Sequence, residues 1–205
     1  MGLIADIMIS MKVTKEKAAE NRRSLVRAAS KLFRQHGING VGVADVGKAA
    51  GLTHGALYAQ FPSKEALAAE ALTDALDRSY ARTMASGAGD QPSIAEYLDL
   101  FLRKNHRDNI ATGCAMAASG SEIARQGKSV SQAFADGYER FARSVQKALG
   151  DTALSATQRQ RALTIIAAEI GAIVVARAVA KADPSLSDEV LVAARRVLGE
   201  VGGEL

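Results

Sequence analysis

This chain of 205 residues is short of several residue types, and each shortage excludes a class of protein. Its single cysteine, Cys114, excludes a disulfide within the chain and fits a reducing compartment. The histidines lie far apart without metal-ligand spacing, and no phosphate-loop, nucleophile-elbow or zinc-protease motif occurs. We therefore expect no catalytic residue, no metal and no cofactor.

Prolines and strand-like patterns are also scarce, which favours an all-α fold. No stretch alternates with the period of two that a half-buried strand requires. Instead, apolar residues recur at helical spacing along most of the chain, as in the stripe formed by Leu25, Ala28, Ala29, Leu32 and Phe33. The sequence predicts about nine helices and no sheet.

Nothing in the sequence predicts secretion or a membrane anchor. The first twelve residues contain an apolar stretch, but they lack both a basic start and a small-residue cleavage site. The longest apolar stretch, Ala162 to Ala182, is rich in alanine and is interrupted by Glu169 and Arg177. We expect a cytoplasmic protein without a membrane partner, in which this stretch forms a buried helix.

Charge and composition divide the chain into a head and a body. Residues 1–62 carry nine Lys and Arg against four Asp and Glu, a net charge of +5, whereas the remainder sums to −1. A basic segment suits a polyanionic partner, although a solvated basic face is the alternative. We expect a flexible tail over 1–14, a DNA-binding head over 15–62 and a helical body over 63–205, with 63–85 as the connecting helix.

A glycine-containing turn between two short helices predicts a helix-turn-helix motif in the head. Gly51 permits the reversal, because a positive backbone angle is inexpensive only for glycine. The second helix then carries small or polar residues that fit a groove roughly 12 Å wide: Thr53, His54, Gly55, Ala56, Ala59 and Gln60. Tyr58 and Lys64, at its flanks, suit phosphate contacts. Further contacts to the DNA backbone or the minor groove would come from Lys12, Lys15, Lys17, Arg22 and Arg23. Periodicity alone leaves ordinary helix packing as an equal alternative.

The order of residues in "ADVGKAAGLTHGALYAQFPSKEAL" resembles the signature of the TetR/AcrR family of bacterial transcriptional regulators. The matching positions are Val46, Ala49, Ala50, Gly51, Thr53, Leu57, Tyr58, Phe61, Ser63, Lys64, Glu65 and Leu67. The resemblance covers about Arg22 to Leu76. The chain departs from the family pattern at Gln60, where an aromatic residue or histidine is usual. It also has Val41-Gly42-Val43 before the second helix, where the family often has Ser or Thr, so a contact at Val43 would use backbone amides.

The resemblance implies a homodimeric regulator, most often a repressor, that a small-molecule inducer releases from a palindromic operator. Two-fold symmetry also suits a single recognition helix, which touches few base pairs. The resemblance points to a dimer interface on the last two helices, with Ile166, Ile170, Ile173, Val174, Arg177, Ala194, Val197 and Leu198. The alternative is that the penultimate helix is the core of one subunit.

The inducer pocket is predicted among aromatic, soft and polar residues of the body. These candidates are Phe101, Asn105, His106, Cys114, Met116, Tyr138, Phe141 and Glu169. Each of them could instead belong to the core or the surface. If Gly113 precedes a helix, Cys114 lies in its first turn, where the helix dipole favours a reactive thiolate. A buried, inert cysteine is the alternative, and we favour it.

Two other functions remain open from the sequence. One is a helical protein that binds small molecules without recognising specific DNA. The other is an all-α enzyme using Glu169, His106 or Cys114, and the absence of a paired catalytic motif disfavours it.

Overall fold

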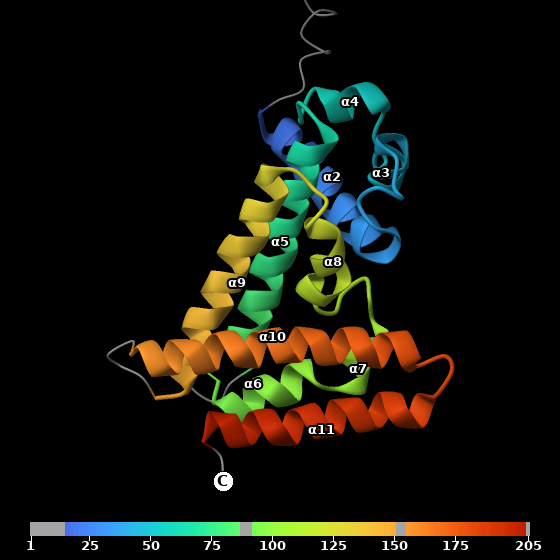
Figure 1. The fold of residues 1–205 in the computed structure, drawn as a ribbon. Coiled ribbons are helices and arrows are strands. Elements are labelled where there is room, and N and C mark those ends of the chain that lie inside the picture. Colours follow the sequence, from blue (N-terminus) through green and yellow to red (C-terminus); the bar gives the residue numbers. More distant parts are fainter. Residues whose placement is uncertain (1–14, 87–91, 151–154, 204–205) are drawn as a thin grey trace, which may run out of the picture.

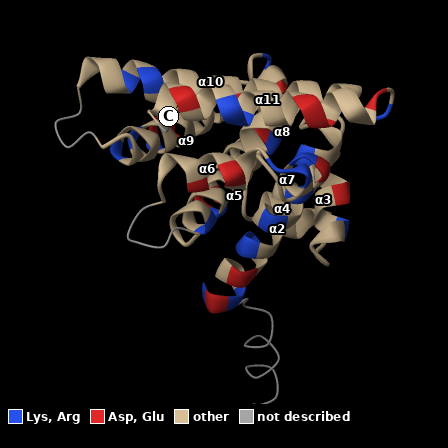
Figure 2. Ribbon diagram, turned by 90° about the horizontal axis from the view of Figure 1, so that it is seen from below, with Lys and Arg blue, Asp and Glu red and all other residues tan. Residues whose placement is uncertain are grey.

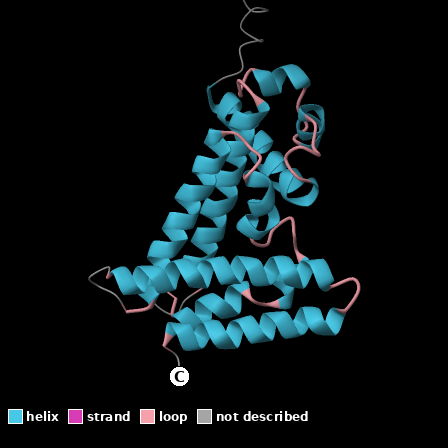
Figure 3. Ribbon diagram, in the orientation of Figure 1, coloured by secondary structure: helices cyan, strands magenta, loops and turns pink. Residues whose placement is uncertain are grey.

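The computed structural model describes residues 15–86, 92–150 and 155–203, and within these segments all regular structure is helical (Figure 3). The predicted tail, residues 1–14, lies outside the described residues. The prediction of an all-α fold is confirmed. The described segments contain ten helices rather than about nine, because a short helix, α7 (Lys104–Asp108), was not predicted.

The head contains α2 (Lys15–His36), α3 (Val43–Ala49) and α4 (His54–Tyr58). The apolar stripe of α2 faces inward as its spacing predicts, with Leu25 and Ala29 fully buried and Phe33 nearly so. Val46 of α3 and Leu57 of α4 complete this small core, and neither has any exposed surface.

Two long helices, α5 (Lys64–Met84) and α9 (Lys128–Ala148), pack side by side and extend from the head to the far end of the body (Figure 1). The shorter α8 (Ala115–Ile123) contacts α2, α5 and α9, and so lies between head and body. Helices α5 and α8 therefore both connect the two parts of the molecule.

The far end of the body is formed by α10 (Ala156–Val179) and α11 (Pro184–Gly202), which run across the ends of α5 and α9 (Figure 1). Helix α6 (Ile94–Phe101) packs on α9 and α11, and α7 lies against α10. The cavity described below opens where α5, α6 and α7 meet the chain that leads into α8.

Candidate DNA-binding surface and ligand cavity

The turn between α3 and α4 has the geometry that its glycine predicts. Gly51 has φ +69°, a left-handed conformation that residues with a side chain rarely adopt. The amide of Leu52 donates to the carbonyl of Gly47 at 2.9 Å and closes the turn. The expectation of a positive φ at Gly51 is confirmed.

Helix α4 begins at a side-chain cap and presents several residues to solvent. The hydroxyl of Thr53 accepts a hydrogen bond from the Ala56 amide at 3.2 Å, so Thr53 caps the helix. His54 is exposed and Tyr58 is 50% exposed, and their rings meet edge to face at 4.9 Å. Thr53, Gly55 and Ala59 are exposed as well, whereas Ala56 and Gln60 are partly buried.

Packing within the single chain does not require a glycine at position 55. A β-carbon built on it would meet no other atom within 4 Å, so the space beside it is open. Gly55 therefore does not serve close helix packing within the single chain. A small residue with open space beside it allows another molecule to approach the helix backbone closely.

Two further predicted DNA contacts flank α4. Lys64 opens α5 directly after Ser63, whose hydroxyl accepts a hydrogen bond from the Ala66 amide at 3.0 Å. Val43 is the first residue of α3, follows the cap residue Gly42, and is partly buried. Both residues lie at helix starts, where backbone amides without a partner within the helix favour an anion.

Arg22 does not have the role that the sequence suggested. Its guanidinium pairs with Glu70 of α5, donates to the carbonyl of Gln60 at 2.5 Å and lies 4.1 Å from the ring centre of Phe61. A guanidinium held by these groups fastens α2 to the start of α5 and is not available to phosphate.

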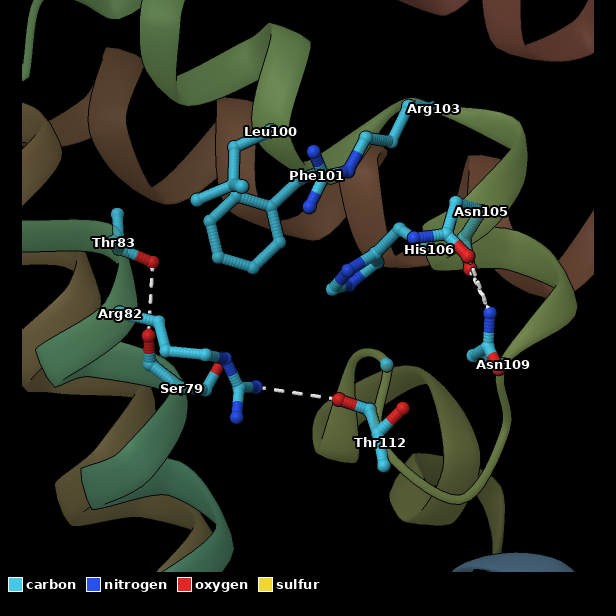
Figure 4. Close-up of a pocket in the computed structure, with 11 residues that line it drawn as sticks. Ser79, Arg82, Thr83, Leu100, Phe101, Arg103, Asn105, His106, Asn109 and Thr112 are labelled. Atoms are coloured by element: carbon cyan, nitrogen blue, oxygen red, sulfur yellow. Dashed lines mark hydrogen bonds between the residues drawn. The ribbon is translucent and has the colours of Figure 1, made fainter. Parts of the chain in front are cut away.

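The body contains a cavity of about 230 Å³ that three predicted ligand residues line (Figure 4). Phe101, Asn105 and His106 converge there from α6 and α7, and the rings of Phe101 and His106 meet edge to face at 5.1 Å. Sequence analysis missed the other lining residues: Ser79, Arg82, Thr83, Leu100, Arg103, Asn109, Thr112 and Gly113. The α5 members could have been found by extending the buried stripe of α5 two turns beyond Leu76. The members between α7 and α8 carry no periodic signal.

The remaining predicted ligand residues do not line this cavity. Cys114, Met116, Phe141 and Glu169 surround a much smaller space beside it, and Phe101 and Ser79 border both. Tyr138 borders neither space. Its hydroxyl donates to the carbonyl of Leu163 at 2.7 Å, so Tyr138 joins α9 to α10 instead.

The structure places Cys114 at the start of α8, as predicted, but gives it the properties of an inert thiol. Its sulfur accepts a hydrogen bond from the Ala117 amide at 3.3 Å, yet the residue is only 5% exposed. Burial, and next the nearby Glu169, raise the pKa of the Cys114 thiol to about 12. Burial thus outweighs the helix-terminal effect, and the reactive-thiolate alternative is wrong for this conformation.

A single carboxylate joins the body to the turn that follows α2. Glu122, in the last turn of α8, accepts hydrogen bonds from the amides of Ile38 and Asn39, both at 2.9 Å. Since Val43 begins α3 only a few residues later, any shift of α8 acts directly on the chain entering the helix-turn-helix motif.

The predicted interface residues on α10 and α11 divide into two groups. Ile166, Ile173 and Leu198 are buried within the chain itself, so placing them on an interface was wrong. Ile170 and Ala194 pack partly against the core, and Arg177 donates to the carbonyls of His106 and Arg107. Only Val174 and Val197 are well exposed, and the helical period adds two valines that sequence analysis missed, Val175 and Val192.

Helices α10 and α11 expose four valines, Val174, Val175, Val192 and Val197. Figure 2 shows the two helices side by side, with Lys, Arg, Asp and Glu at scattered positions along them. By length and composition alone α10 would qualify as a membrane span, the single such helix in the described segments. It packs on α9 and α11, however, and it contains the fully buried Glu169, as a core helix of a globular protein can.

The sequence similarity to known proteins lies mainly in the head. Residues 25–71 match the model of "Bacterial regulatory proteins, tetR family". The chain is 39% identical over 57 residues to the HTH-type transcriptional regulator AcrR of Shigella flexneri, covering 28% of this chain and 26% of AcrR. It is 37% identical over 67 residues to the HTH-type transcriptional regulator TtgR of Pseudomonas putida, covering 33% and 31% respectively. The match thus spans only about a quarter to a third of these relatives.

Solved structures extend the similarity to the whole fold. The reduced form of NemR from E. coli superposes with a TM-score of 0.72 at 20% identity, over 88% of this chain and 95% of NemR. A TetR transcriptional regulator from Chloroflexus aurantiacus gives 0.73 at 23% identity, over 90% and 95%. At these identities the likeness concerns the fold.

Proposed function

Because the chain belongs, through its N-terminal domain, to the TetR/AcrR family of transcriptional regulators, we propose that it is a ligand-responsive repressor. It binds a palindromic operator as a homodimer in the bacterial cytoplasm and leaves the DNA when a small-molecule inducer binds the body. The observation that carries this proposal is the outer face of α4, with its open Gly55 and exposed Thr53, His54, Tyr58 and Ala59.

In the proposed complex, α4 enters the major groove while Tyr58, Lys64 and the backbone near Val43 hold phosphates. Gly55 and Ala56 bring the helix backbone close to the bases, and Thr53, His54 and Gln60 supply hydrogen-bonding groups. The partial burial of Ala56 and Gln60 leaves the N-terminal turn of α4 and Tyr58 as the main contacts.

The second subunit would cover the apolar face of α10 and α11. Val174, Val175, Val192 and Val197 are 44%, 48%, 69% and 48% exposed, which is unusual for so many neighbouring valines on a monomer. Two copies related by a two-fold axis would bury them in a four-helix bundle. Light scattering should then give twice the chain mass, and Val192→Glu should give the monomer, with the exposed Ala178→Glu as a second probe of the same face.

The inducer would act by shifting a population of conformations. It would bind more tightly to a body arrangement in which the two heads do not fit successive major grooves, so inducer and operator weaken each other reciprocally. Helix α5 and the Glu122 contact of α8 are the two connections through which that shift would reach the head.

Selection of bound fragments from random DNA tests this function. A regulator recovers a palindrome whose half-site spacing reports the dimer geometry, and its affinity falls steeply with salt. Tyr58→Phe, which removes only one exposed hydroxyl, should weaken binding to every selected sequence alike. Recovery of random fragments, with equal weak binding to all of them, would favour the alternative of a small-molecule binding protein without specific DNA recognition.

A further inference from the structure

The cavity between α5, α6 and α7 has an unusual distribution of charge. Among the described residues, the charged side chains that line it are Arg82 and Arg103, and none of the lining residues is acidic. The described acids nearest in the chain are paired elsewhere. Asp77 pairs with Arg140 at 2.5 Å, Asp99 with Arg195 at 2.5 Å and Asp108 with Arg107 at 2.6 Å. Within the part of the chain that the structure describes, the cavity is therefore a positively charged site without an internal counter-ion.

Besides burial, Arg82 and Arg103 both lower the pKa of His106, which lies between them in the lining of the cavity. His106 projects into the cavity, and its pKa is lowered to about 4 by burial first and then by Arg177, Arg103 and Arg82. The imidazole is consequently neutral near pH 7, so it adds no charge of its own. Its Nε2 atom is buried and has no hydrogen-bond partner among the described residues, which leaves one polar atom unsatisfied at the cavity.

Part of the wall is apolar. Leu100 and Phe101 line it, and the Phe101 ring is held edge to face against His106. Arg82 already donates to the carbonyl of Thr112 at 3.2 Å, whereas the Arg103 side chain shows no hydrogen bond or ion pair within the described segments. The site thus offers guanidinium donors, a neutral imidazole and one apolar surface.

We propose that this cavity binds a small organic anion, with its acid group held by Arg82 and Arg103 and its apolar part against Leu100 and Phe101. The inference rests on the proposed ligand response and names the chemical class of the inducer. Guanidinium groups bind carboxylates and phosphates through paired, charge-assisted hydrogen bonds, and both acids share this chemistry. The unpaired Nε2 of His106 supplies a third polar contact.

Calorimetric titration with matched compounds tests the charge requirement. The probes are benzoate, hexanoate and phenyl phosphate, compared with benzamide, hexanamide and benzylamine. We expect at least one anion to bind about tenfold or more tightly than its neutral or cationic counterpart. The carboxylate and phosphate arms decide which acid the site prefers. Equal binding of the counterparts, or no binding of any anion at millimolar concentration, would overturn the proposal.

Variants then locate the site. Arg103→Gln should weaken binding of the preferred anion about tenfold while leaving the fold unchanged, because the side chain has no partner to lose. Arg125→Gln is the matched control, since Arg125 is exposed on the C-terminal side of α8 and lines none of this cavity. Wild-type affinity in Arg103→Gln, or an equal loss in both variants, would contradict the assignment.

The DNA selection described above separates this inference from the proposed function. If a palindrome is recovered but only neutral or cationic compounds release the protein, the regulator stands and the anion site fails. If an anion binds through Arg103 but no sequence is selected, the site stands and the regulator fails.

Discussion

The head and the body place their functional residues in opposite ways. The proposed recognition surface is one short stretch, residues 53–60, whose members stand side by side on α4 and its caps. The cavity gathers Arg82 from α5, Phe101 from α6, His106 from α7 and Thr112 from the chain leading to α8. The difference teaches that a contiguous surface depends on local helix geometry, whereas a cavity depends on how four elements meet.

The largest effect is expected where the recognition helix touches the core. Leu57 has no exposed surface, so Leu57→Ala should lower the free energy of unfolding by about 2–5 kcal/mol. Its neighbour Tyr58 is 50% exposed, and Tyr58→Ala should change stability by no more than about 0.5 kcal/mol while DNA affinity drops. Urea unfolding of both variants, with a DNA titration, measures the contrast. Similar stability losses in the two would show that α4 does not separate binding from packing.

The second prediction concerns Glu169 in the body. It is a fully buried acid, and no acid among the described residues of the head is buried. Burial raises the pKa of Glu169 to about 8, although a hydrogen bond from Tyr97 lowers it in part. The pKa of Glu169 in the folded protein lies above its usual value of 4.5. The stability that this residue contributes is therefore complete below pH 4.5 and is lost as the pH rises toward about 8.

Unfolding measured across this window should therefore show stability falling by about 1.4 kcal/mol per pH unit from this residue. Glu169→Gln should flatten that dependence, since the amide does not titrate. An identical slope in wild type and variant would mean that the carboxyl is ionised when folded.

A glycine from each region gives the next contrast. A β-carbon on Gly113 would lie 2.5 Å from the carbonyl oxygen of His106 and 2.6 Å from that of Asn109. Because these backbone atoms cannot turn away, Gly113→Ala should cost about 1–3 kcal/mol and distort the cavity wall.

Gly55→Ala has no such neighbour, and it should leave stability unchanged or raise it by about 0.5–1 kcal/mol while weakening DNA binding. Thermal unfolding ranks the two variants. If Gly113→Ala is the more stable of the two variants, the predicted difference between the crowded Gly113 and the open Gly55 is wrong.

The smallest effect concerns the contact between the two regions. Glu122→Gln keeps one acceptor oxygen but loses the charge that receives the Ile38 and Asn39 amides, which should cost about 1 kcal/mol. Its clearer consequence should be a changed ratio of DNA affinities with and without inducer. A wild-type ratio in this variant would assign the coupling to α5 alone.

Much of the head could be predicted because its signals are local. Thr53 and Ser63 cap helices by accepting from amides three residues later, and Gly51 reverses the chain within one turn. Arg22 was misassigned for the opposite reason. Its partner Glu70 is 48 residues away, and charge alone does not distinguish an arginine that holds helices together from one that binds phosphate.

In the body, sequence analysis found some cavity residues but not their grouping. Phe101, Asn105 and His106 meet in one space, whereas Cys114, Met116, Phe141 and Glu169 surround another, and Tyr138 belongs to neither. For α10 and α11 the sequence showed the helical period clearly, but it did not show which face of each helix points into the core. Both faces are apolar, so burial of Ile166 and Ile173 and exposure of Val175 could not be read from the pattern.

The sequence by itself determined the all-helical architecture, the helix starts and the small, outward residues of α4, because caps, periodicity and glycine turns act within a few residues. Only the tertiary structure decided which arginines remain without a counter-ion, which isoleucines fill the core and where α8 holds the head. Those properties depend on distances between segments far apart in the chain, and packing alone sets them.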